Sequence, residues 1–302
     1  MAHPGHQHAH QAHPHGHQPD APSSGAAFRW SIALNSGLTA LQLLIGLAFG
    51  SLALIGDALH NLGDVLGLVL GWGADRLSRR PAAGRFTYGY GRSTLMASLL
   101  NGVLIFSAGV VVVVEALQRL RDPVPVIAGP VAWAAAAGIV INLLSARLFG
   151  HGHRHDLNQR AAVLHLLTDA AVSVAVLLSA LAVAATGWLW LDAITAIGVG
   201  LAVMASALGL LREALALNLD AVPRHINLAA VEAVLLALPG VQAVEELHVW
   251  GLSTSRTALT AHLRLAPGAA GGDGLLAEAQ ARLEPLGIRK STIQLERPQP
   301  PA

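Results

Sequence analysis

Long stretches without a single charged side chain constrain the fold of this chain most strongly. Four segments contain no Asp, Glu, Lys or Arg: 30–56, 93–114, 129–146 and 193–211. A helix of about 20 apolar residues is long enough to cross a lipid bilayer. Charged residues make up 12% of the chain, roughly half of the share that is usual in soluble domains. We therefore expect a membrane protein, because a soluble all-α protein and a disordered chain both fit this pattern poorly.

Two further apolar segments, 51–75 and 161–186, are interrupted by a few ionisable residues. Between the first two helices, Gly46, Gly50 and Ser51 predict a tight turn. We predict an α-helical membrane protein with six transmembrane helices in a domain of residues 28–218. Their approximate bounds are 29–49, 52–76, 93–117, 129–149, 161–186 and 191–213.

The arginines are distributed unevenly between the two ends of these helices. One set of ends carries Arg29, Arg76, Arg79, Arg80, Arg85, Arg92, Arg147, Arg154, Arg160 and Arg212, and the other carries Arg119 and Arg121. Because positive charge favours the cytoplasmic side, this bias predicts that both termini are cytoplasmic. Residues 1–27 lack the apolar core of a signal peptide, and Lys290 is the only lysine among 19 basic residues, which indicates a GC-rich bacterial genome. We expect a multi-pass protein of the bacterial inner (plasma) membrane, with the lipid bilayer as a partner.

The two ends of the chain differ from the apolar middle. Residues 1–27 hold seven of the 15 histidines among Pro, Gly and Gln, which predicts a disordered cytoplasmic tail that either collects metal ions or is simply solvated. Residues 219–297 predict a small α+β domain with the order α-β-β-α-β, containing strands at 242–252, 257–265 and 290–296. Residues 298–302 are expected to be a second disordered tail.

Ionisable residues inside the predicted spans are the strongest functional signal. His60 and Asp64 are four residues apart, and so are His165 and Asp169, so each pair lies on one helix face. If the two helices face each other, two nitrogens and two oxygens converge, a ligand set that suits tetrahedral Zn²⁺. The alternative is a pair of His–Asp hydrogen bonds that only join helices. Asp57 shares the face of Asp64, and either belongs to a proton or ion path, snorkels outward or caps its helix.

Other functions are excluded by what the chain lacks. Without cysteine it has neither thiolate zinc sites nor a cysteine nucleophile, and without an HExxH motif it offers no metallohydrolase centre. The net charge of +1 gives no case for nucleic acid as a partner. We therefore expect that the protein is not an enzyme.

Several motifs occur in one order along the chain: GSLALIGDALHNLGD at 50–64, RFTYGYGR at 85–92, RLRDPVPV at 119–126, HDLN at 155–158, LHLLTDAAVS at 164–173 and LHVWGLS at 247–253. By these motifs the chain resembles the cation diffusion facilitator family, in particular its zinc-transporting branch. The resemblance implies six membrane helices, a cytoplasmic metallochaperone-like domain, a homodimer, and exchange of a divalent cation for protons. The transport site of the family carries over onto His60, Asp64, His165 and Asp169.

The resemblance also implies features outside the transport site. A cytoplasmic metal site would use His248, His262 and Glu296, although Gln294 is a poor ligand beside them and ordinary strand surface is the alternative. A charge interlock, meaning an ion pair between the third span and the chain after the sixth, would join Arg92 to Asp220, with a simple surface ion pair as the alternative. A further metal site known in some relatives is not expected, since residues 78–91 contain neither Asp nor His.

The loop before the fifth span contains His151, His153 and His155, which either pass ions to His165 or form only a polar loop. Taken together, the sequence predicts a Zn²⁺/H⁺ antiporter that exports zinc from the cytoplasm. Zinc is then the transported substrate, with a structural role for zinc as an option, and protons are the counter-ion. The alternatives are efflux of cadmium, cobalt or nickel, and a membrane-bound metal sensor that does not transport.

Overall fold

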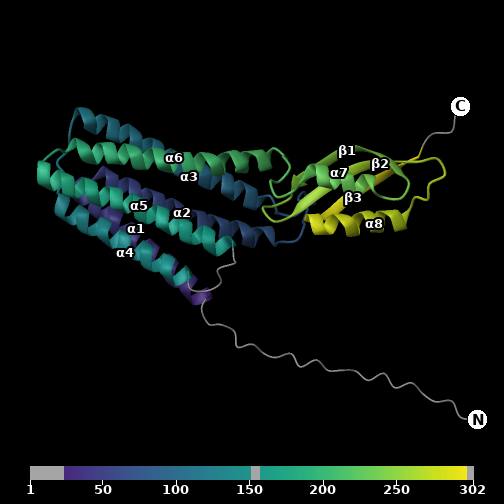
Figure 1. The fold of residues 1–302 in the computed structure, drawn as a ribbon, viewed down its shortest axis with the longest axis horizontal. Coiled ribbons are helices and arrows are strands. Elements are labelled where there is room, and N and C mark those ends of the chain that lie inside the picture. The colour runs from purple at the N-terminus through teal and green to yellow at the C-terminus, as the bar shows by residue number, and fades with distance from the viewer. Residues whose placement is uncertain (1–23, 151–156, 298–302) are drawn as a thin grey trace, which may run out of the picture.

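The computed structural model describes residues 24–150 and 157–297, with side chains from 33 to 147 and from 163 to 297. Six long helices form a bundle, and a small α+β domain follows at one end of it (Figure 1). The helices are α1 (Ser24–Phe49), α2 (Leu52–Ser78), α3 (Ser93–Arg121), α4 (Ala128–Gly150), α5 (Leu157–Thr186) and α6 (Trp190–Asn218). The fold class predicted from the sequence is confirmed.

The predicted boundary at residue 28 lies inside a helix, because α1 already begins at Ser24. The last proline of the preceding segment is Pro22, so no proline after it hinders a helix. Most of the predicted His-rich tail, the loop residues His151, His153 and His155, and the tail at 298–302 lie outside the described residues.

Five of the six helices are long and apolar enough to cross a membrane: Leu52–Ser78, Ser93–Arg121, Ala128–Arg147, Val163–Thr186 and Trp190–Asn218. In α1 the part with described side chains, Ala33–Phe49, is also apolar but shorter. Successive helices run in opposite directions, so α2, α4 and α6 all end toward the α+β domain (Figure 1). We call this end of the bundle the domain end and the opposite end the far end.

Exposed tryptophans lie at both ends of the bundle. Trp133, Trp188 and Trp190 are exposed near the far end, where the last two rings stack with centroids 5.7 Å apart. Trp72 is exposed near the domain end, and the guanidinium of Arg76 lies 5.8 Å from its ring centroid. Tryptophan is enriched at both membrane–water interfaces of membrane proteins, and the exposed tryptophans at the two ends of the bundle agree with that distribution.

An apolar core joins the helices in the far half of the bundle. It contains buried Leu52 and Leu54 of α2, Val112 of α3, Val131 of α4 and Val176 of α5. The turn that leads into this core depends on Gly50, whose φ is +77° and whose missing Cβ would lie 2.5 Å from the Pro125 carbonyl oxygen. The far half is therefore closed by close-packed side chains.

The α+β domain has the predicted order of elements. These are α7 (Leu228–Leu236), β1 (Val241–Gly251), β2 (Thr257–Leu265), α8 (Asp273–Leu283), a 3-10 turn (Glu284–Leu286) and β3 (Ile288–Glu296). Strand β2 is central, antiparallel to β1 and parallel to β3. Its alternating residues Leu259, Leu263 and Leu265 are buried together with Leu235 and Leu283 of the helices, as the period-two pattern of an amphipathic strand requires.

Candidate metal site

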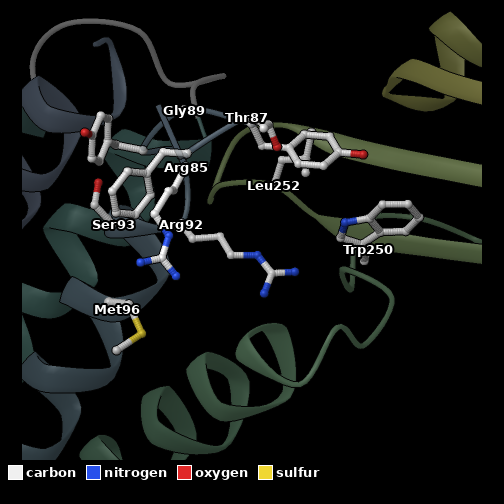
Figure 2. A pocket seen from close by; sticks show the side chains of 12 residues that line it. Arg85, Thr87, Gly89, Arg92, Ser93, Met96, Trp250 and Leu252 are labelled. Atoms are coloured by element: carbon white, nitrogen blue, oxygen red, sulfur yellow. The ribbon is translucent and has the colours of Figure 1, made fainter. Parts of the chain in front are cut away.

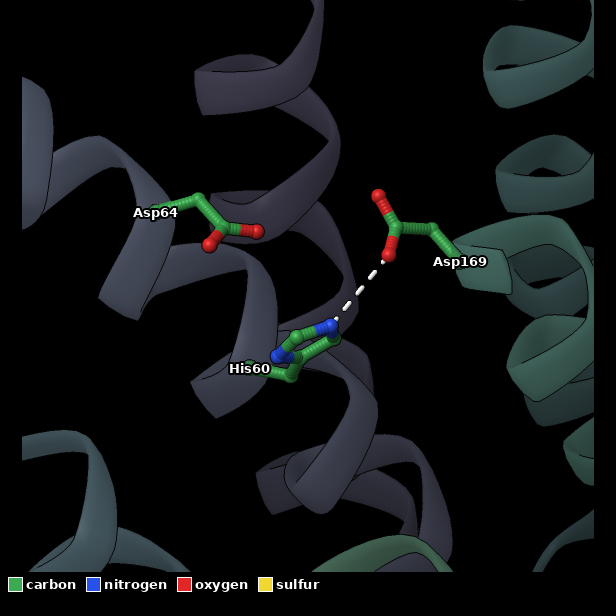
Figure 3. A group of neighbouring side chains, drawn as sticks. All are labelled: His60, Asp64 and Asp169. Carbon is green, nitrogen blue, oxygen red and sulfur yellow. Dashed lines mark hydrogen bonds and ion pairs between the residues drawn. The ribbon is translucent and has the colours of Figure 1, made fainter. Parts of the chain in front are cut away.

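Helices α2 and α5 bring all four intramembrane ligand candidates together. The His60 Nε2 atom lies 3.2 Å from Asp169 Oδ1, and His165 Nε2 lies 3.1 Å from Asp64 Oδ2. His165 Nε2 also lies 3.7 Å from Asp169 Oδ2. Ligand atoms of His60, Asp64 and Asp169 all fall within 4.8 Å of one another (Figure 3). Each histidine therefore contacts the aspartate of the opposite helix.

The four ligand candidates differ in exposure along the axis of the bundle. Since α2 runs toward the domain end and α5 runs away from it, Asp64 and His165 lie one turn nearer that end than His60 and Asp169. The side chains of this nearer pair are 37% and 48% exposed, whereas those of His60 and Asp169 are 13% and 4% exposed. The more exposed ligand candidates thus lie toward the domain end, and the apolar core lies toward the far end.

The separations of the ligand atoms fit a tetrahedral ion. Zinc binds imidazole nitrogen and carboxylate oxygen at about 2 Å, so two ligand atoms on a tetrahedron lie about 3.3 Å apart. The N–O separations of 3.1, 3.2 and 3.7 Å among the four residues are close to that value. Ligand atoms of His60, Asp64 and Asp169 lie within 4.8 Å of one another, so a cation shared by the set would draw these side chains closer together, and the two carboxylates would offset its charge.

A buried polar group lies one turn further toward the far end. Asp57 is completely buried, and its Oδ2 accepts hydrogen bonds from Gln42 Nε2 at 2.8 Å and Ser173 Oγ at 2.9 Å. Asn61 Nδ2 donates in turn to Gln42 Oε1 at 3.2 Å. Among the described residues, Asp57 Oδ1 has no hydrogen-bond partner. Complete burial excludes snorkelling, and Ser51 rather than Asp57 caps α2.

Sequence reasoning missed one buried carboxylate, Asp192, at the far end of α6. Its Oδ1 accepts from Ser51 Oγ at 2.6 Å, and its Oδ2 accepts from the Leu52 backbone N–H at 2.7 Å and, more weakly, from that of Ala53 at 3.4 Å. Ser51 Oγ accepts the Leu54 N–H at 3.2 Å. Free N–H groups at a helix start need such acceptors, so Asp192 holds the start of α2 against α6.

The missed residues share a feature that could have revealed them. Gln42, Asn61 and Ser173 are uncharged polar residues within apolar spans, and a search for charged groups alone passes over them. In a bilayer such side chains need partners, so an amide in an otherwise apolar span already indicates an interhelical contact. Asp192 stands in the first turn of its span, where a carboxylate is often read as a surface residue.

The cytoplasmic candidates are only partly brought together. His262 Nδ1 lies 2.8 Å from Glu296 Oε1, while its Nε2 lies 3.7 Å from Glu246 Oε2. The two carboxylates face opposite nitrogens of the imidazole ring. An ion bound to one of these nitrogens could therefore be reached by only one of the two carboxylates. Gln294 donates to Glu296 at 3.4 Å. Within the described residues His248 is exposed and makes no hydrogen bond or ion pair with His262 or Glu296.

The predicted ion pair between the bundle and the α+β domain is present. Arg92 Nη2 donates to Asp220 Oδ1 at 2.5 Å, and both side chains are about half exposed. The same junction contains a hydrogen bond from the Thr254 N–H to Thr94 Oγ1 at 3.1 Å. It also places Lys290 Nζ 4.5 Å from the ring centroid of Tyr88. The start of α3 and the loop before it thus contact the end of the sheet where β1 ends and where β2 and β3 begin.

Comparison with known proteins agrees with the division of the chain into two parts. The profile of the cation efflux transmembrane domain matches residues 29–217. The profile of the cytoplasmic domain of cation efflux proteins matches residues 223–298. The first match covers the six helices and the second covers the α+β domain.

Individual proteins of similar sequence are named for metal transport. The zinc transporter ZitB of Escherichia coli K12 is 34% identical over 270 residues, which cover 88% of this chain and 86% of that protein. The metal cation efflux system protein CzcD of Cupriavidus metallidurans is 34% identical over 233 residues, covering 77% and 74%. A cadmium, cobalt and zinc/H⁺–K⁺ antiporter of Bacillus subtilis is 27% identical over 274 residues, covering 88% and 87%.

Proposed function

Since this chain belongs to the cation efflux family of divalent metal transporters, we propose that it exports Zn²⁺ from the cytoplasm in exchange for protons. The convergence of His60, Asp64, His165 and Asp169 between α2 and α5 carries this proposal. A set of two nitrogens and two oxygens suits zinc better than the hard cations Mg²⁺ and Ca²⁺, which take oxygen ligands.

The polarity of the site supports a direction of transport. The more exposed pair, Asp64 and His165, faces the domain end, and the family profile describes the attached domain as cytoplasmic. Zinc would enter from this side and bind first near these two residues. Movement of the helices then closes the domain end and opens the far end, where the core of Leu52, Leu54 and Val176 must separate.

Protons are the proposed counter-ion because every ligand in the site is titratable. Zinc requires deprotonated imidazole and carboxylate, so protons arriving at the far end displace it. A free imidazole has a pKa of about 6.5 and changes charge in the physiological range. Asp57 lies between the site and the far end, and its unpaired buried oxygen supports the proposal that it lies on the path of these protons.

We also propose the membrane orientation and the assembly. Described arginines are concentrated at the domain end, including Arg76, Arg80, Arg85 and Arg212, whereas Arg119 and Arg121 lie at the far end. The positive-inside rule then supports cytoplasmic termini in a bacterial inner membrane. The cytoplasmic domain matches a family of domains that is named for dimer formation, which supports a homodimer.

The function is tested with purified protein in sealed vesicles that contain a zinc dye and a pH dye. The wild type should accumulate zinc against its gradient while protons move in the opposite direction. His165→Ala should lose this flux, whereas His225→Ala, which changes an exposed histidine outside the bundle, should keep it. Flux that ignores an imposed pH gradient would contradict antiport.

The same vesicles separate the alternatives. Zinc binding without flux would indicate a sensor, and downhill flux without proton coupling would indicate a channel. Cadmium, cobalt and nickel are each offered in place of zinc, because a relative is named for cadmium and cobalt as well as zinc. Faster transport of one of these ions than of zinc would change the assigned substrate but leave the site unchanged.

A further inference from the structure

A pocket of about 390 Å³ lies at the domain end, outside the metal site. The loop between α2 and α3 forms one wall, and the end of strand β1 forms the other (Figure 2). Its side chains include Arg85, Phe86, Tyr88, Arg92, Met96 and Trp250. The two guanidinium groups extend into the space between α3 and Trp250 (Figure 2). None of these residues takes part in the proposed transport site.

The charged side chains that line the pocket are two arginines. No Asp or Glu lines it, and Arg85 makes no ion pair with any residue that the structure describes. Arg92 uses one N–H group on Asp220, and a guanidinium has five such donors, so donors remain for a further acceptor. Lys290 over Tyr88 adds another cation beside the pocket wall. An anion, and in particular a phosphate group, is the complementary ligand.

An apolar face of α3 continues from this pocket into the membrane. Met96, Leu100 and Val103 are 56%, 48% and 44% exposed, and their spacing of four and three residues places them on one side of the helix. Phe86 and Tyr88 line the pocket and are exposed, and aromatic side chains of this kind favour the headgroup region of a bilayer. A cationic pocket next to an apolar helix face complements an anionic phospholipid, whose charged headgroup is attached to apolar acyl chains.

We infer that this pocket binds the phosphate headgroup of an anionic phospholipid, with Arg85 and Arg92 as its donors and the acyl chains along the exposed face of α3. Basic pockets at the cytoplasmic ends of transmembrane helices bind anionic headgroups in this way. Because residues of both the bundle and the α+β domain line the pocket, a bound lipid would contact both units. The inference does not depend on which ion is transported.

The test counts the lipids that remain on the full-length protein. The protein is placed in bilayer discs of equal phosphatidylcholine and phosphatidylglycerol and then analysed by native mass spectrometry. The wild type should keep phosphatidylglycerol preferentially. Arg85→Gln should lower its retention about fivefold, the effect of one basic residue near an anionic membrane, whereas Arg85→Lys should retain most of it. Arg80→Gln is the matched control, since this arginine belongs to the same loop and does not line the pocket.

Three results would overturn the inference. Equal retention of the two lipids by the wild type would show that the pocket does not select an anionic headgroup. Displacement of phosphatidylglycerol by millimolar inorganic phosphate would assign the pocket to a soluble phosphate instead. A lower dimer fraction in Arg85→Gln at unchanged lipid retention would assign the pocket to the contact between two copies of the chain.

Discussion

Two serines of α5 have different surroundings although both are buried. Ser173 Oγ donates to the carboxylate of Asp57 at 2.9 Å, whereas Ser179 Oγ has no partner among the described residues. A hydrogen bond to a charged group contributes more than one between neutral groups, while a buried hydroxyl without a partner costs stability. The two positions therefore form a matched pair on one helix.

We expect Ser173→Ala to lower the free energy of unfolding by about 1–3 kcal/mol, because it removes a donor from a buried carboxylate. Ser179→Ala should leave stability unchanged or raise it slightly. The stability of both variants is measured by heating them in detergent and determining the fraction that remains folded by size-exclusion chromatography. Equal destabilisation by the two variants would show that the bond to Asp57 contributes nothing specific.

Zinc affinity should fall as the pH falls. Protons compete with the ion for the imidazole nitrogens and the carboxylate oxygens, so binding weakens by up to tenfold per pH unit for each proton displaced. Calorimetric titration between pH 5.5 and 7.5, in buffers of different ionisation enthalpy, measures affinity and proton release together. An affinity that is constant across this range would show that the histidines are not ligands. Asp169→Ala, which removes a proposed ligand, serves as the non-binding control.

For individual residues, the sequence was sufficient to predict those contacts that follow from spacing along one helix. The i,i+4 spacing of His60 with Asp64 and of His165 with Asp169 was enough to predict that they share a face. It could not predict that each histidine contacts the aspartate of the other helix, since this depends on the relative shift of α2 and α5. Nor could it predict that His248 lies opposite Thr260 and His262 opposite Glu245, because strand register decides which side chains meet.

At the scale of the element, the start of α2 depends on a carboxylate from another helix. Asp192 accepts bonds from Ser51 Oγ and from the Leu52 and Ala53 backbone. On the other side of the same turn, Arg119 Nη1 donates to the Gly50 carbonyl oxygen at 2.6 Å. The start and end of a helix are the hardest parts of an apolar segment to predict, because hydropathy does not indicate which side chain supplies the cap.

Asp192→Ala should destabilise the protein by about 1–3 kcal/mol, since it leaves buried donors without acceptors. Hydrogen exchange should rise at the first residues of α2, from Leu52 to Ile55, before it rises elsewhere in the bundle. Asp192→Asn keeps a carbonyl oxygen as acceptor and should recover part of the loss. Unchanged exchange at the start of α2 in the alanine variant would mean that Asp192 is not its cap.

At the scale of the whole molecule, one exposed ion pair joins the two units that the sequence predicted separately. Composition and periodicity were sufficient to predict both the six helices and the order α-β-β-α-β. Their contact could not be derived from either pattern, since Arg92 and Asp220 are far apart in the chain. Only the resemblance to a family suggested that pair.

Charge reversal tests this junction. Exposed ion pairs contribute about 0–1 kcal/mol, so Arg92→Asp or Asp220→Arg alone should change the unfolding temperature little. Each should, however, repel a neighbour and increase the spread of distances between spin labels on α6 and on α8. The double exchange should restore the narrow wild-type distribution. Identical distributions in single and double variants would show that the pair does not position the domain.

The crossed pairing of histidine and aspartate between α2 and α5 also has an electrical consequence. With neutral imidazoles the empty site carries two negative charges, the zinc-loaded site carries none, and the site with two added protons again carries none. Charge inside a bilayer costs several kcal/mol, so the two neutral forms can change orientation while the doubly negative form is held back. The exchange cycle would then move no net charge, and its rate would be independent of the membrane potential, which a valinomycin clamp on zinc-transporting vesicles can measure.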